Sequence, residues 1–254
     1  MNVPEGQPKV GVGARQTRSR PLLRAIGVLP SKFERDELTD EEFEQFYGKG
    51  ERELQHLLDD IRIHTGVDGL TGRTGLDYGG GMGRLSIPMA ERCERVYSLD
   101  VNEHLLAQGA RNAERKGVNN MEWLPASVDM VDSLAGEYDA VVSTWVLQHI
   151  RTREGERIFA SLVGGLRPGG VGAINATLGQ QHPWRGVVRG LAKRHHQQLY
   201  QALRHYSLDR MGEMMVSAGI TDCYVRWQTR RGGEIISGAL GSFPSAMLVF
   251  RKPE

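Results

Sequence analysis

The segment LDYGGGMGRLS, at residues 76–86, restricts the fold of this chain more than any other. Four glycines, at positions 79, 80, 81 and 83, follow an apolar strand-like run that contains Asp77 and precede a helix-like pattern. Glycine adopts backbone conformations with positive φ at no steric cost and lets a ligand approach peptide N–H groups closely. The segment therefore predicts a tight strand-to-helix turn that carries a ligand site.

Strand-like and helix-like patterns alternate after Arg73. The segments GLDYG, RVYSLDV, MEWLPAS, YDAVVSTWV and VGAINATL predict strands, and helical patterns lie between them. Such β-α repetition produces a parallel sheet with right-handed crossovers and helices on both faces. Ligands bind these sheets outside the carboxyl ends of the strands, so the glycine turn lies where a ligand site is expected.

The spacing of the glycines argues against two phosphate-binding motifs. The dinucleotide fingerprint G-x-G-x-x-G requires a glycine where the chain has Met82 or Arg84, and no Gly-Lys-Ser/Thr closes the turn as in a P-loop. The spacing G-x-G-x-G after Asp77 suits a ligand with an amino-acid end. Asp100, which closes the strand RVYSLD, can accept hydrogen bonds from two ribose hydroxyls.

Taken together, these features resemble class I S-adenosylmethionine-dependent methyltransferases. The resemblance covers about residues 43–178, and more loosely the end of the chain; it is carried by LDYGGGMGRLS, SLDVNEHLL, YDAVVSTWVLQHI and LRPGG. It implies an α/β, Rossmann-like sheet of seven mostly parallel strands, with helices on both faces and an antiparallel last strand. The segments TDCYVRWQTRR and SAMLVFRK resemble the closing strand pair of the family.

The resemblance implies S-adenosylmethionine as the cofactor, with its methionine part on the glycine turn, its ribose at Asp100 and its adenine near Val101. Where the family commonly has an acid beside the adenine, this chain has Ser127 and Val128, so the adenine contacts remain open. The residues expected to line the cofactor are Tyr47, Asp77, Gly79, Gly81, Gly83, Asp100, Val101, Ser127, Val128 and Thr144.

Composition and charge fit an α/β domain with an N-terminal addition. The 254 residues carry a formal net charge of +1, so no overall field suggests a nucleic-acid partner. Cys93 and Cys223 are too few for a disulfide framework or a zinc site, and no metal is expected. The N-terminus lacks the pattern of a signal peptide, and no apolar run is long enough for a membrane span, which predicts a cytoplasmic protein without a membrane partner.

The expected regions are a flexible basic arm at 1–30, a helical lid at 31–70 and the methyltransferase domain at 71–254, with an acceptor-binding insertion at about 179–206.

The lid is expected to contain two helices. Asp40 would cap the first, and Gly48 and Gly50 would form the turn before the second. Some members of the family have an N-terminal lid of this kind, and by that resemblance Tyr47 and Gly48 would close over the cofactor. A capped helix and a glycine turn without that role are the alternative.

Catalytic and acceptor-binding residues are expected after the fourth and fifth strands. His149 follows the fourth strand at the ligand-facing edge, where it could act as a general base or only cap or pack the next helix. The insertion after the fifth strand is rich in Gln, His, Arg and aromatic residues. The residues expected to contact the acceptor are Trp145, His182, Trp184 and Arg185.

The sequence thus predicts an enzyme that transfers a methyl group from S-adenosylmethionine to a small-molecule acceptor. A hydroxyl of a sugar or secondary metabolite is the preferred acceptor. An amine, a phenol or a protein side chain is the first alternative, and a non-catalytic cofactor-binding module is the second. No NPPY- or DPPY-type sequence follows the fourth strand, which argues against methylation of base amines.

Overall fold

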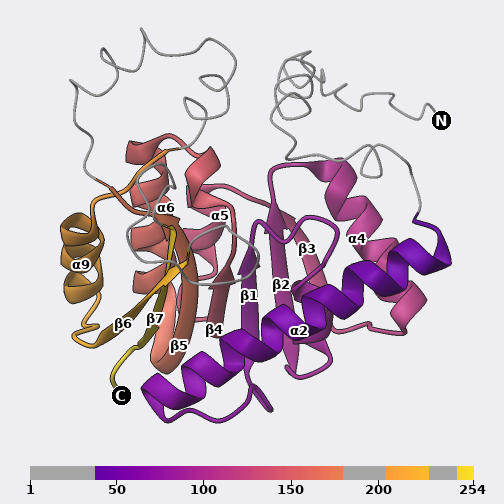
Figure 1. Cartoon of the computed structure of the whole chain (residues 1–254), viewed down its shortest axis with the longest axis horizontal. Helices are drawn as coiled ribbons and strands as arrows, with labels where there is room; N and C mark the ends of the chain where they lie inside the picture. The colour runs from indigo at the N-terminus through magenta and orange to yellow at the C-terminus, as the bar shows by residue number, and fades with distance from the viewer. Residues whose placement is uncertain (1–37, 180–203, 229–244) are drawn as a thin grey trace, which may run out of the picture. The chain divides into compact units, whose positions relative to one another are not determined.

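A computed structural model describes residues 38–179, 204–228 and 245–254, and within these it contains one seven-stranded sheet with the order β3-β2-β1-β4-β5-β7-β6 (Figure 1). All neighbours from β3 to β5 pair in parallel, and β7 is antiparallel to both β5 and β6. The predicted mixed sheet is therefore confirmed. The strands are β1 Thr74–Tyr78, β2 Arg95–Asp100, β3 Met121–Pro125, β4 Tyr138–Ser143, β5 Leu166–Thr177, β6 Cys223–Gln228 and β7 Ser245–Arg251.

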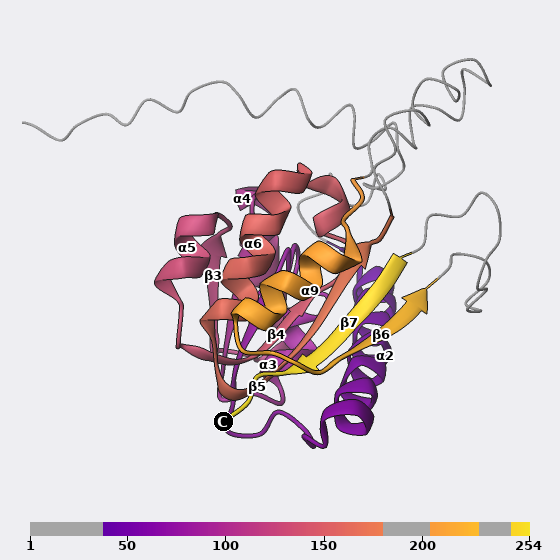
Figure 2. The same ribbon diagram turned by 90° about the vertical axis from the view of Figure 1, so that its left-hand side faces the viewer.

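Helices lie on both faces of the sheet, with α2 on one face and α5, α6 and α9 on the other (Figure 2). Helix α3 packs with α2, and α4 packs on β2 and β3. A short 3₁₀ helix, η3, follows β4. The helices are α2 Asp40–Thr65, α3 Ser86–Ala90, α4 Glu103–Lys116, α5 Val128–Ser133, η3 Leu147–His149, α6 Thr152–Gly165 and α9 Leu208–Ser217.

Two apolar clusters hold these layers together. One joins α2 and α3 to the sheet, and its members from α2 are Leu54, Leu57, Leu58 and Ile61. The other joins α5, α6 and α9 to the opposite face, with Met211 and Met215 buried in it. Because both faces are covered, the central strands are apolar almost throughout, as expected for a parallel sheet.

Helix α2 is continuous, so the prediction of two helices separated by a turn at Gly48 and Gly50 was wrong. Gly50 is buried, and a Cβ atom there would overlap the carbonyl oxygen of Arg84. Glycine inside a helix costs about 1 kcal/mol relative to alanine, and burial of the apolar face of α2 offsets that cost. This glycine therefore permits close packing and does not form a turn.

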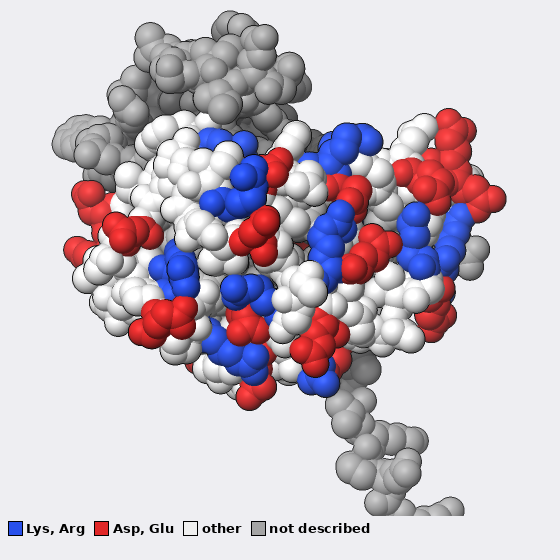
Figure 3. All heavy atoms as spheres, turned by 90° about the horizontal axis from the view of Figure 1, so that it is seen from below, with Lys and Arg blue, Asp and Glu red and all other residues white. Residues whose placement is uncertain are grey.

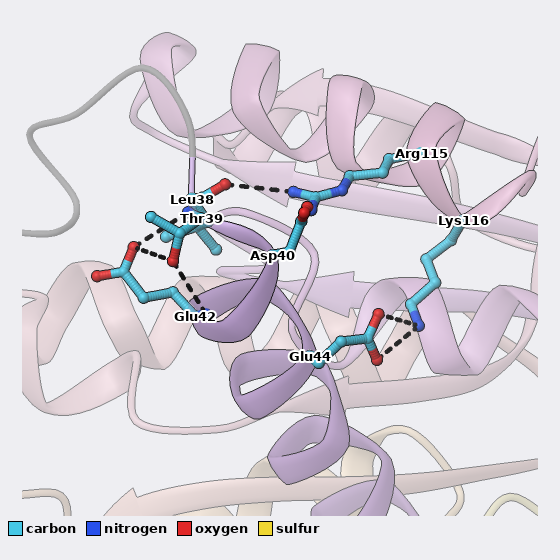
Figure 4. A network of polar contacts seen from close by, with 7 residues as sticks. All are labelled: Leu38, Thr39, Asp40, Glu42, Glu44, Arg115 and Lys116. Atoms are coloured by element: carbon cyan, nitrogen blue, oxygen red, sulfur yellow. Dashed lines mark hydrogen bonds and ion pairs between the residues drawn. The ribbon is translucent and has the colours of Figure 1, made fainter.

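The N-terminus of α2 also differs from the prediction, because Thr39 and not Asp40 is the N-cap. The hydroxyl of Thr39 accepts a hydrogen bond from the Glu42 N–H at 3.3 Å, and the Glu42 carboxylate accepts from the Thr39 N–H at 3.1 Å. This reciprocal arrangement is a capping box. Asp40 instead lies in the first helical turn, where it forms an ion pair with Arg115 of α4 (Figure 4).

Two other helix ends have residues that are typical of helix caps. Gly117 ends α4 in the left-handed conformation, with φ of 72°. Ser207 caps α9, and its hydroxyl accepts a hydrogen bond from the Arg210 N–H at 3.3 Å. These local signals required no knowledge of tertiary contacts.

The surface carries charges of both signs. On the face shown in Figure 3, Lys and Arg side chains alternate with Asp and Glu side chains, and neither sign forms a continuous patch. In the described segments, every helix is too short or too polar to cross a lipid bilayer.

Candidate functional site

The glycine turn lies between β1 and α3 at the carboxyl edge of the sheet. Its backbone is fixed to β2, because the N–H groups of Gly79 and Gly80 donate to the carbonyl oxygen of Leu99 at 2.6 and 3.0 Å. Gly79, Gly81 and Gly83 have φ of 83°, 55° and 87°. Side chains rarely adopt these values, so the G-x-G-x-G spacing reflects a backbone requirement at each position.

The turn is packed on one side and open on the other. A Cβ atom at Gly79 would overlap the side chain of Val146, and one at Gly83 would crowd neighbouring side chains. At Gly81, a Cβ atom would meet only the Asp100 carboxylate, 3.9 Å away. The open side therefore faces Asp100, and a ligand can approach the backbone there.

Asp77 lies beneath the turn, in a cluster of buried polar side chains. Its carboxylate accepts a hydrogen bond from the Ser86 hydroxyl at 2.5 Å, and the Ser86 and Ser98 hydroxyls are 2.9 Å apart. Burial raises the pKa of Asp77 to about 6, although the Ser86 hydrogen bond and the charge of Arg84 oppose this shift. A carboxylate with so little hydration favours a cationic partner.

Asp100 closes β2 beside the open side of the turn. One carboxylate oxygen accepts from the Gly81 N–H at 3.0 Å and the other from the Asn102 N–H at 2.8 Å. Burial raises the pKa of Asp100, and these backbone hydrogen bonds lower it. Each oxygen retains a second lone pair, which can accept a hydrogen bond from a ligand hydroxyl. The following residue, Val101, is 75% exposed.

The segment expected near the adenine has a clear structural role. The Ser127 hydroxyl accepts a hydrogen bond from the Met130 N–H at 3.0 Å and caps α5. Val128 packs partly against the apolar cluster beneath α5. These contacts account for both residues, and an additional contact with adenine stays a prediction.

Tyr47 of α2 contacts the glycine turn directly. Its side chain is 4% exposed, and its hydroxyl donates to the carbonyl oxygen of Met82 at 2.6 Å. Burial raises the pKa of this phenol above its ordinary value, so the hydroxyl remains a hydrogen-bond donor. The structure therefore places Tyr47 against the glycine turn, and a contact with the cofactor stays a prediction.

The end of β4 lies beside β1 and the turn. The Ser143 hydroxyl is buried and donates to the Tyr78 carbonyl oxygen at 2.9 Å, and Thr144 accepts a hydrogen bond from Arg84 at 3.3 Å. Trp145 follows with φ of 62° and is, among the described residues, the one non-glycine residue with positive φ. Backbone strain of this kind persists where the surrounding structure fixes it, often at binding sites.

His149 lies in η3, at the end of the same segment, and its side chain is exposed. Neighbouring protein atoms still remove part of its hydration and lower its pKa below the ordinary value. The side-chain amide of Gln148, which is 3% exposed, lies 3.4 Å from its Nε2 atom. A neutral imidazole at this position could accept a proton.

The other predicted acceptor contacts, His182, Trp184 and Arg185, lie outside the described residues. Of the residues that are described, no three or more His, Cys, Asp and Glu side chains form a group that could hold a metal ion.

Sequence reasoning missed Ser86, Ser98, Arg84 and Glu53 as parts of this site. Ser98 gives a usable signal, because it is a small polar residue within an apolar strand that neighbours β1. Arg84 and Glu53 form an ion pair across a separation of 31 residues, and no local pattern joins them.

Comparison with known proteins identifies the class of domain that this site resembles. Residues 76–170 match a family described as "Methyltransferase domain". A ubiquinone biosynthesis O-methyltransferase from Acinetobacter baumannii is 35% identical over 99 residues, which are 37% of this chain and 42% of the relative. A tRNA 5-carboxymethoxyuridine methyltransferase from Escherichia coli is 34% identical over 98 residues, 38% of this chain and 37% of the relative. The match thus spans less than half the length of these relatives.

Solved structures with similar folds include two with S-adenosylhomocysteine bound. One is a magnesium protoporphyrin IX methyltransferase from Synechocystis, with a TM-score of 0.57 and 15% identity, over 93% of this chain and 95% of that one. The other is a phosphoethanolamine N-methyltransferase from Haemonchus contortus, with a TM-score of 0.59 and 17% identity, over 80% of this chain and 53% of that one. At this identity, the likeness establishes the shared fold.

Proposed function

We propose that this chain, which carries a class I S-adenosylmethionine-dependent methyltransferase domain, transfers the cofactor's methyl group to a hydroxyl of a small molecule. The observation that carries the proposal is the glycine turn, whose open side at Gly81 faces the carboxylate of Asp100. Backbone N–H groups, a buried acid and a second carboxylate converge there. This set suits a ligand with an ammonium group at one end and a ribose in the middle.

The proposed cofactor contacts follow from the chemistry of these groups. Asp77 is buried, so water compensates its negative charge poorly. It would therefore attract the methionine ammonium directly or through water. Asp100 would accept hydrogen bonds from the ribose hydroxyls, and the exposed Val101 would face the adenine. Ser127 and Val128 would border the adenine.

When bound, the cofactor supplies an activated methyl group on a sulfonium. The protein's contribution is then mainly geometric, because the acceptor must approach in line with the carbon–sulfur bond, and orientation of this kind contributes several kcal/mol. Thr144 and Trp145 lie at the end of β4, where they would border the methionine part and the acceptor. His149 would accept the proton that a hydroxyl acceptor loses.

The relatives and the position of His149 bear on the class of acceptor. Among the relatives are an O-methyltransferase of ubiquinone biosynthesis and a tRNA methyltransferase. An N-methyltransferase shares the fold. A neutral, exposed His149 favours a hydroxyl acceptor, since a neutral amine attacks without a base. The first alternative is an amine acceptor on a small molecule or a protein side chain.

The cofactor site is tested by calorimetric titration with S-adenosylhomocysteine, a stable analogue of the cofactor. The wild-type protein should bind it with micromolar affinity, and Asp100→Ala should weaken that binding at least about tenfold, because two charge-assisted hydrogen bonds are lost. The absence of heat from folded wild-type protein would contradict the proposal.

The acceptor is tested separately, with isotopically labelled S-adenosylmethionine and a panel of acceptors. The panel contains sugars and phenols, amines, a histone-like peptide and transfer RNA. Label on a sugar or phenol hydroxyl would support the proposal, and label on an amine, peptide or RNA alone would replace it with one of the alternatives.

A further inference from the structure

Helix α2 meets the glycine turn through one stripe of residues at a spacing of three. Tyr47, Gly50 and Glu53 lie on the same side of the helix, because residues three apart are neighbours on a helical surface. Tyr47 donates to the Met82 carbonyl oxygen at 2.6 Å, and Gly50 packs against the carbonyl group of Arg84. Glu53 forms an ion pair with the Arg84 guanidinium. The stripe therefore holds the second half of the turn.

Arg84 connects this stripe to the end of β4. Its two terminal nitrogens donate to the two carboxylate oxygens of Glu53, and Nη2 also donates to the Thr144 hydroxyl at 3.3 Å. The Arg84 and Glu53 side chains are 22% and 27% exposed, so water competes little for these contacts. A two-pronged contact between guanidinium and carboxylate fixes the plane of the guanidinium, and with it the N–H that reaches Thr144.

Building on the cofactor site proposed above, we propose that Arg84, oriented by Glu53, is a positioning residue that fixes the Thr144 hydroxyl for the methionine carboxylate of the cofactor. The Thr144 hydroxyl oxygen accepts a hydrogen bond from Arg84, so its own O–H remains free to donate. Thr144 is 8% exposed and follows β4, which pairs with β1 immediately before the turn. A carboxylate is the acceptor that such a donor favours most.

The same pair of charges acts on Asp77. The charged groups that face Asp77 are Arg84 from the turn, Asp100 from β2 and Glu53 from α2. Arg84 lowers the pKa of Asp77, and Asp100 and Glu53 raise it. Removing Arg84 should therefore raise this pKa further, and neutralising Glu53 should lower it. The two shifts have opposite signs because the two charges do.

The chain offers a matched control in a second ion pair of α2. Glu51 pairs with Arg92, which follows α3 and also donates to the Pro88 carbonyl oxygen at 2.7 Å. The Arg92 and Glu51 side chains are 28% and 43% exposed. This pair attaches the same helix to the same region, but the structure shows no contact between Arg92 and the turn or Thr144 among the described residues.

The test is calorimetric titration with S-adenosylhomocysteine from pH 5 to pH 8, together with thermal unfolding. The proteins are the wild type, Arg84→Met, Arg84→Lys, Glu53→Gln and the control Arg92→Met. At pH 8, Arg84→Met should weaken binding at least about tenfold, the usual effect of losing one charge-assisted contact, and Arg84→Lys should recover part of the loss. The pH below which affinity falls should move up in Arg84→Met and down in Glu53→Gln. Arg92→Met should bind like the wild type.

The outcomes separate this inference from the proposed function. If the folded wild type does not bind the analogue, the proposed function fails. If the wild type binds and Arg84→Met binds equally well, the inference is wrong. Equal losses in Arg84→Met and Arg92→Met, or shifts of the same sign in Arg84→Met and Glu53→Gln, would also overturn it. Should Arg84→Met not fold, the comparison of Arg84→Lys with Arg92→Met decides the question: the inference stands only if Arg84→Lys binds the analogue more weakly than the wild type and Arg92→Met does not.

Discussion

The proposed cofactor side and the proposed acceptor side of this site are built differently. On the cofactor side, the glycine turn is fixed to β2 by two backbone hydrogen bonds, and Asp77 is 3% exposed. On the acceptor side, Trp145 is 37% exposed at positive φ, and His149 is exposed on a short 3₁₀ helix. Among the described residues, the proposed cofactor contacts are thus fixed by the sheet, whereas the proposed acceptor contacts are exposed side chains. Substitutions on the two sides should therefore separate cofactor affinity from turnover.

The largest expected effect is on turnover, in His149→Ala. Loss of a general base lowers kcat by about 10² to 10⁴, and the affinity for S-adenosylhomocysteine should stay unchanged because the turn is untouched. Neighbouring protein atoms remove part of the hydration of His149 and lower its pKa below the ordinary value, so the wild-type rate should be constant near neutrality and fall only at more acidic pH. The measurement is the pH dependence of kcat with the acceptor found in the panel.

A second histidine provides the control for this variant. His64 of α2 stacks on Tyr224 of β6, with ring centroids 3.4 Å apart, and belongs to neither side of the site. His64→Ala should keep the wild-type kcat. Wild-type turnover in His149→Ala would show that this residue only packs against the next segment.

The next effect should appear on the cofactor side, in Gly79→Ala. Its φ of 83° strains any side chain, and the added Cβ would overlap Val146, so we expect a loss of about 2–4 kcal/mol in the free energy of unfolding. Binding of S-adenosylhomocysteine should fall with it, because the turn must shift. Denaturant unfolding and calorimetry measure the two losses.

Gly164→Ala is the matched control for this substitution. Gly164 lies in α6, and a Cβ atom there would have no neighbour within 4 Å. Alanine in a helix should raise the free energy of unfolding by about 0.5–1 kcal/mol. A Gly79→Ala protein as stable as the wild type would mean that the turn is more adaptable than its packing indicates.

Asp77→Asn should move stability and affinity in opposite directions. The pKa of Asp77 is about 6 in the fold, above its ordinary value of 3.8, so the native state binds more protons between these limits. The free energy of unfolding of the wild type should therefore fall as the pH rises from about 4 to 6. At pH 7, Asp77→Asn should be more stable by about 1–3 kcal/mol and should bind S-adenosylhomocysteine more weakly. Urea titrations at pH 4 and pH 7 test the sign; a variant that is less stable at pH 7 would contradict it.

Much of the proposed cofactor side could be predicted from the sequence, because its main residues lie close together in the chain. The glycine turn and Asp100 lie at the ends of neighbouring strands, and their spacing is enough to place them together. The continuity of α2 could not be predicted, since Gly50 is explained only by its contact with Arg84, distant in the sequence. The ion pair between Glu53 and Arg84 has the same origin.

The acceptor side was harder to predict for a related reason. The positive φ of Trp145 has no signal in its residue type, because aromatic residues rarely adopt it. Strain of this kind becomes visible only in the folded chain.

The smallest effect, and the one that tests the acceptor side most directly, concerns this strain. Trp145→Gly and Trp145→Ala both remove the ring, but only glycine tolerates φ of 62° without cost. The glycine variant should therefore be more stable than the alanine variant by about 1 kcal/mol. Both should raise the KM for the acceptor by about threefold to tenfold, an effect of up to about 1.4 kcal/mol, and leave the affinity for S-adenosylhomocysteine unchanged. Equal stabilities would show that the surrounding structure does not impose this conformation. A loss of cofactor affinity would place Trp145 on the cofactor side and remove the division between the two.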